Sequence, residues 1–188
     1  MKTVTLKAIR KHKPCVESWE ILLSSLDKTK ADDTKVSLEY ILDLLGLDDA
    51  LWALRALPES QDSSVRLLVC DLVTPAMKYT NDPRLAEAIR VAREYALGNA
   101  TSDSLEAARA AAGSAAWSTT LPAAGSAAWA AARAAAWSVV WAAARAAAWS
   151  VARAAAEDVP GSATWAMAED VARKDQERIF RDWLRSES

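Results

Sequence analysis

The segment DPRLAEAIRVAREYALG, from Asp82 to Gly98, carries every local signal of an α-helix and decides the fold class. Asp82 is a favourable N-cap, Pro83 suits the first helical position, and Gly98 suits the position after the last turn. The apolar residues between them recur with helical spacing: Leu85, Ala88, Ile89, Ala92 and Tyr95. The sequence therefore predicts an amphipathic helix between Asp82 and Gly98.

The chain before this segment predicts four shorter helices. Apolar residues at helical spacing, polar N-caps, and proline or glycine stop signals mark them. Their predicted positions are Pro14–Leu26, Ser37 to Gly46, Asp48 or Asp49 to Pro58, and Ser63 or Ser64 onwards with a kink or an end at Pro75. The charged stretch of residues 27–35 lacks apolar periodicity.

The chain after this segment predicts a sixth helix and then a break. Asp103 and Glu106 have the spacing of a capping box, which favours a helix from Ser104 towards Trp117. Residues 119–122, which include a proline, interrupt the pattern.

A low-complexity stretch follows the break. The sequence WAAARAAAWSVV at 129–140 recurs as WAAARAAAWSVA at 141–152, with a period of twelve residues. Twelve residues rotate a straight helix by about 120°, so the copies share no single face and do not form a heptad seam. We expect one long helix over residues 123–159 that Pro160 and Gly161 end, followed by a last helix that carries Trp165, Val171, Ile179, Phe180 and Trp183.

Composition agrees with these local signals. The chain has 188 residues, 52% of them hydrophobic with alanine dominant, and only five glycines. Such a composition favours helices and leaves little material for hairpins or phosphate-binding loops. We therefore predict an all-α single domain over residues 1–188, a bundle of about eight helices with the long Ala/Trp-rich helix at its centre. An acidic helical part spans residues 14–99, and an Ala/Trp-rich part spans residues 102–185.

Charge and cysteine content restrict the partners and the compartment. A net charge of −2 and a pI near 5.5 argue against nucleic acid or an anionic membrane as partner. Cys15 and Cys70 lack the spacing of a disulfide scaffold and are expected to be reduced. No export signal is recognisable, and three arginines interrupt the alanine-rich stretch that could otherwise cross a membrane. We expect a cytoplasmic protein.

Residues for catalysis or metal binding are scarce. The chain has one histidine, and His12 with Cys15 lacks the two further ligands of a four-coordinate metal site. No phosphate-binding loop, dinucleotide fingerprint or nucleophile motif occurs. The sequence predicts no enzyme, no metal and no cofactor.

Aromatic and cationic side chains alternate through the repeat. A ladder with four-residue steps is formed by Trp129, Arg133, Trp137, Trp141, Arg145 and Trp149. This spacing allows cation–π pairs on adjacent turns. The ladder either fills a helical core beside small alanines or forms a stacking platform for a nucleotide-like ligand, with an arginine on its phosphate.

Acidic residues are concentrated in the first third of the chain. Residues 14–62 hold eleven carboxylates against four basic residues, a net charge of −7. These carboxylates either belong to ordinary solvated loops and helix starts or attract a basic partner. The candidate partner-binding residues are Asp48, Asp49, Trp52, Arg55, Glu59 and Asp62. Trp52 and Arg55 have side-chain types common in interface hot spots, although Trp52 also fits a place in the core.

Four runs of sequence carry a family resemblance. They are Cys15 to Trp19, GLDDALWALRA at 46–56, VRLLVCD at 65–71 and AIRVAREYALG at 88–98. Together with the Ala-, Trp- and Arg-rich second half, these runs resemble a family of bacterial immunity proteins. The resemblance implies a helical protein that binds and neutralises a cognate toxin, and it implies no catalytic residues.

The expected function is therefore that of a non-catalytic immunity-type protein that binds a protein toxin. Two alternatives stay open. One is a phage or mobile-element inhibitor of a host defence nuclease, and the other is a small-molecule binder that uses the Trp/Arg ladder.

Overall fold

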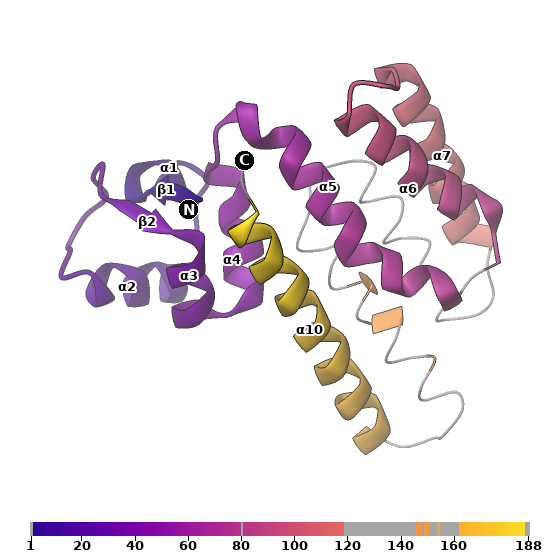
Figure 1. Cartoon of the computed structure of the whole chain (residues 1–188). Helices are drawn as coiled ribbons and strands as arrows, with labels where there is room; N and C mark the ends of the chain where they lie inside the picture. The colour runs from indigo at the N-terminus through magenta and orange to yellow at the C-terminus, as the bar shows by residue number, and fades with distance from the viewer. Residues whose placement is uncertain are drawn as a thin grey trace. The chain divides into compact units, whose positions relative to one another are not determined.

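The computed structural model describes residues 2–79, 81–118, 146–147, 149–150, 154 and 162–186 (Figure 1). In these residues the chain is all-α, as predicted, with eight α-helices, three 3₁₀ helices and one two-stranded sheet. The contacts group into two compact units: unit 1 is Met1–Gln61 with Arg181–Ser188, and unit 2 is Asp62–Phe180. The long helix predicted over residues 123–159 falls almost entirely outside the described residues.

Unit 1 begins with a short β-ribbon that the sequence did not predict. Strand β1 (Thr3–Thr5) pairs antiparallel with β2 (Lys35–Ser37), so that Val4 lies opposite Val36 and both valines are buried. Each strand leads directly into a helix, β1 into α1 (Leu6–Lys11) and β2 into α3 (Leu38–Leu45). Three-residue strands are too short to show a period of two, so the sequence pattern could not reveal them.

The predicted boundaries of α3 are confirmed. The Ser37 side chain accepts a hydrogen bond from the Tyr40 backbone N–H at 3.0 Å, which is the geometry of an N-cap. Gly46 ends the helix with φ of +87°, in the left-handed region that favours glycine. The same glycine is the N-cap of α4 (Leu47–Ala53). The prediction that Asp48 or Asp49 caps this helix is wrong, because both aspartates lie inside its first turn.

Helix α2 spans Val16–Ser25, and two 3₁₀ helices, η1 (Leu54–Ala56) and η2 (Glu59–Gln61), follow α4. The apolar faces of α2 and η1 meet those of α1, α3 and α4 in a core with side chains at most 7% exposed: Leu6, Trp19, Leu22, Leu38, Ile41, Leu51 and Leu54. The last turn of α10 (Ser162–Arg185) also belongs to unit 1. There, the Lys2 ammonium donates to the backbone oxygens of Trp183 and Ser186.

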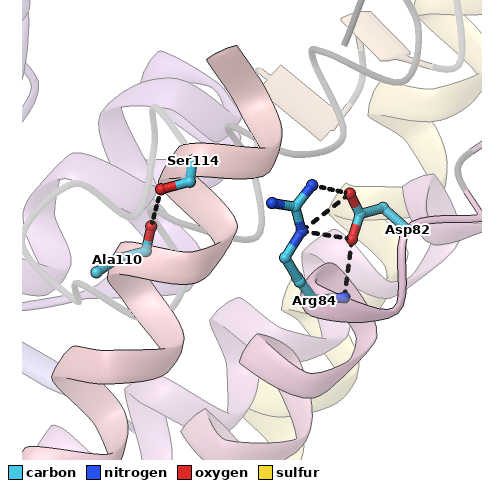
Figure 2. A network of polar contacts seen from close by, with 4 residues as sticks. All are labelled: Asp82, Arg84, Ala110 and Ser114. Carbon is cyan, nitrogen blue, oxygen red and sulfur yellow. Dashed lines mark hydrogen bonds and ion pairs between the residues drawn. The ribbon is translucent and has the colours of Figure 1, made fainter. Parts of the chain in front are cut away.

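Unit 2 contains α5 (Asp62–Val73), η3 (Thr74–Tyr79), α6 (Pro83–Ala96), α7 (Ser102–Ser118) and the earlier turns of α10. As predicted, α5 stops just before Pro75. Helix α6 also begins as predicted, because an Asp82 carboxylate oxygen accepts the Arg84 backbone N–H at 3.0 Å (Figure 2). The Arg84 guanidinium donates to the same carboxylate (Figure 2).

The start of α7 differs from the prediction. Thr101 and Ser104 form a reciprocal cap, in which each side-chain oxygen accepts the other residue's backbone N–H, at 3.2 and 3.1 Å. The predicted Asp103–Glu106 box is wrong, since Glu106 pairs with Arg109 instead. Further along α7, the Ser114 hydroxyl donates to the Ala110 carbonyl (Figure 2).

Helices α5, α6 and α7 bury one another's apolar stripes in unit 2. The main side chains of this core, all at most 1% exposed, are Val65, Leu68, Leu72, Leu85, Ala88, Ala92, Ala112 and Phe180. Large fully buried side chains such as Phe180 contribute most of the stability that burial provides.

Candidate functional site

The residues predicted to bind a partner lie mainly on α4 and η1, and we call Asp48, Asp49, Trp52 and Arg55 the α4 surface. Asp48 and Asp49 occupy the first turn of α4, where the positive end of the helix dipole stabilises carboxylates. Asp48 and Arg55 are exposed, whereas Asp49 and Trp52 are half-buried. The Arg55 guanidinium lies 5.6 Å from the centroid of the Trp52 ring, within cation–π range.

A small pocket separates the α4 surface from α2. Its volume is about 20 Å³. Five buried residues form its floor: Ile9, Trp19, Leu22, Ile41 and Ala53. Five half-buried residues form its rim: Pro14, Ser18, Leu45, Asp49 and Trp52. The lining is therefore apolar except for the hydroxyl of Ser18 and the carboxyl of Asp49. It includes the indole rings of Trp19 and Trp52.

The carboxyl of Asp49 has an unfavourable environment for its charge. Burial raises its pKa, and the neighbouring charge of Asp48 acts in the same direction. A hydrogen bond from the Ser18 side chain opposes this rise. The Ser18 hydroxyl oxygen also lies 3.1 Å from the Cys15 sulfur, which donates to it.

Glu59 and Asp62 do not belong to this group. Glu59 is exposed on η2, after the chain has left α4. Asp62 is the first residue of α5 and belongs to unit 2. The structure thus brings together four of the six residues predicted to bind a partner.

Several carboxylates of the acidic N-terminal part are neutralised within unit 1. Lys28 pairs with Asp32 at 2.8 Å, and Arg181 pairs with Asp43 at 2.7 Å. Lys7 lies 4.0 Å from Asp33, and Arg181 also reaches Glu39 at 3.9 Å. The negative charge of residues 14–62 is therefore less available to a partner than the sequence total suggests.

Helix α2 also carries exposed acidic and apolar side chains, none of which lines the pocket. Glu17 and Glu20 are exposed, and so are Val16 (67%) and Ile21 (44%). The residues predicted from sequence to bind a partner did not include any residue of α2. Trp19 of α2 is buried in the core. Ser18 and Asp49 both line the pocket, but they lie far apart in the chain, so no local sequence signal links them.

The alternative site, the Trp/Arg ladder, lies almost wholly outside the described residues. Only Trp149 of its members is described. It is 40% exposed, and its indole N–H donates to Glu169 at 3.1 Å. Trp129, Arg133, Trp137, Trp141 and Arg145 are not among the described residues.

Both cysteines are free, as predicted. Cys15 is exposed and caps α2, whereas burial raises the pKa of Cys70 to about 11 and keeps its thiol protonated. Within the part of the chain that the structure describes, no three His, Cys, Asp or Glu side chains come together as a metal site.

Comparison of the chain with known proteins yields no match to a family model, a curated protein or a solved structure. Among the described helices, none combines the length and the apolar character needed to cross a membrane.

Proposed function

We propose that this chain is a non-catalytic protein of the immunity type, which binds a protein toxin and blocks it through the α4 surface. The observation that carries the proposal is the pairing of Arg55 with a half-buried Trp52 beside two aspartates on one short helix. Tryptophan and arginine dominate the binding energy of protein interfaces, and nearby carboxylates attract a basic partner.

The exposed side chains of α2 support the same proposal. Val16 and Ile21 offer apolar area, and Glu17 and Glu20 add negative charge that the ion pairs of unit 1 leave available. Protein interfaces combine apolar contacts in this way with a charged rim. The likeness of residues 46–56 to bacterial immunity proteins points to a toxin as the partner, and a cytoplasmic location fits that role.

The test compares two variants with the same change of charge. Asp48→Asn/Asp49→Asn removes two carboxylates from the α4 surface, and Asp103→Asn/Glu106→Gln removes two from α7 in unit 2. Each protein is immobilised and exposed to an extract of the source cell at low and at high salt. We expect a basic protein to bind the wild type and the α7 variant equally well at low salt. The same protein should bind the α4 variant at least about tenfold more weakly.

The captured protein is then produced in a growing culture. Expressed alone it should stop growth, and co-expression of the wild-type chain should restore growth while the α4 variant should not. The proposal would be overturned if the α4 variant bound the captured protein as strongly as the wild type does. It would also be overturned if the captured protein did not stop growth. Capture of a nuclease that cuts invading DNA would favour the counter-defence alternative, and a retained nucleotide without a protein would favour the Trp/Arg ladder.

A further inference from the structure

We propose that the pocket between α2 and α4 binds one primary ammonium group, that of a lysine side chain on the partner protein. The identity of the partner rests on the proposed function, whereas the chemistry of the pocket stands on its own residues. Size, charge and lining each point to this ligand.

The size of the pocket selects a small group. Its volume of about 20 Å³ holds one group of the size of a water molecule. A primary ammonium has that size. A guanidinium carries three nitrogens in a rigid plane and requires more room, so the pocket discriminates lysine from arginine.

The charge of the pocket selects a cation. Asp49 is the only acidic residue of the lining, and among the described residues no cation pairs with its carboxylate. Its surroundings are apolar on most sides, so its charge is poorly solvated. An ammonium in the pocket would give the carboxylate a charge-assisted hydrogen bond, which is stronger than a hydrogen bond between neutral groups.

The remaining lining suits the stem of a lysine. Trp19 on the floor and Trp52 on the rim supply apolar indole surface. The guanidinium groups of Arg10 and Arg55 already lie 5.6 Å from the centroids of these two rings. Pro14 and Leu45 on the rim supply apolar surface for the methylene groups behind the ammonium. The Ser18 hydroxyl lines the pocket together with the carboxyl of Asp49.

Titration with n-butylammonium chloride tests the pocket without the partner. The readouts are the indole N–H resonances of Trp19 and Trp52 in an ¹⁵N-labelled sample, assigned with Trp52→Phe. We expect saturable shifts with a Kd of about millimolar order, because the ligand has only five non-hydrogen atoms. n-Butanol has the same chain without the charge, and n-butylguanidinium has the larger head; both should bind at least tenfold more weakly.

Two protein variants locate the effect. Asp49→Asn should weaken n-butylammonium binding at least tenfold, whereas Asp33→Asn, which changes an exposed carboxylate in the loop before β2, should leave it within about twofold. A second readout needs no substitution: n-butylammonium should lower the pKa of the Asp49 carboxyl, followed by its ¹³C resonance in the wild type.

The inference is overturned by non-saturating shifts, by equal binding of n-butanol, or by an Asp49→Asn variant that binds n-butylammonium like the wild type. Failure of this inference differs visibly from failure of the proposed function. A partner that needs the two α4 carboxylates while n-butylammonium does not bind contradicts the lysine pocket alone. Binding of n-butylammonium without any toxic partner contradicts the immunity function alone.

Discussion

The Lys2 ammonium donates a 2.8 Å hydrogen bond to the backbone oxygen of Trp183 and lies 4.4 Å from the centroid of the same residue's ring. A second hydrogen bond of 2.9 Å runs to the backbone oxygen of Ser186. The last carbonyls of a helix lack partners within the helix and carry the negative end of its dipole. Lys2 therefore caps the C-terminus of α10, and its burial there lowers the pKa of its ammonium.

Replacement of Lys2 should destabilise unit 1. Lys2→Met keeps the length of the side chain but removes both hydrogen bonds to the end of α10, and we expect a loss of about 1–3 kcal/mol in the free energy of unfolding. The matched control is Lys30→Met, which changes an exposed loop lysine and should cost less than about 0.5 kcal/mol. Urea denaturation measures both variants. Equal midpoints for the two would show that the cap contributes nothing.

The stability of unit 1 should depend on pH through Asp49. Burial raises the pKa of its carboxyl in the folded chain, so the folded state binds this proton more tightly than the unfolded state does. The free energy of unfolding therefore decreases as pH rises from the ordinary carboxyl pKa of about 3.9 to the raised pKa of Asp49, because the folded state gives up this proton less readily. Because Asp49→Asn cannot ionise, its stability relative to the wild type should improve between pH 3 and pH 7.

Asp32 provides a control of opposite sign within the same unit. Hydrogen bonds from Lys28 and Thr34 lower the pKa of its carboxyl, so the ionised form stabilises the folded state. Asp32→Asn should therefore be less stable than the wild type at pH 7, and the difference should shrink as pH falls below about 3.9. Urea midpoints across the pH range report both trends. The same slope for the two variants would contradict the assigned environments.

Two glycines of unit 2 should respond in opposite ways to alanine. Gly98 follows α6 with φ of +79°, and Gly98→Ala should lower stability by about 1 kcal/mol because an L side chain is strained there. Gly113 lies inside α7, and a Cβ added there meets no atom within 4 Å. Gly113→Ala should raise stability by about 0.5–1 kcal/mol through helix propensity. Thermal unfolding measures both changes, and a shift of the same sign in both would refute this account.

Helices with agreeing local signals could be predicted from sequence. Ser37 and Gly46 bound α3 as predicted, and Asp82 and Gly98 flank α6 as predicted, since each signal acts within one turn of the helix end. The cap of α7 could not be predicted from residue spacing alone. Asp103 and Glu106 were predicted to form the capping box, but Thr101 and Ser104, two residues earlier, form the cap.

Features that depend on distant residues could not be predicted. The sequence placed an acidic block before residue 62, but Arg181, from the other end of the chain, neutralises part of it through Asp43 and Glu39. The candidate site was predicted in part. Trp52 and Arg55 adjoin as their spacing on a helix allows, whereas the contact of Ser18 with Asp49 depends on how α2 packs against α4.

The contact of Lys2 with the end of α10 joins two segments that are synthesised at opposite ends of translation. Nearly all of unit 1 is translated first, yet residues 181–186, which supply its last turn and the acceptors of Lys2, are translated after the whole of unit 2. Domains made of one continuous stretch can fold as they leave the ribosome. Unit 1 can therefore make its contacts with the end of α10 only after residues 181–186 have been synthesised.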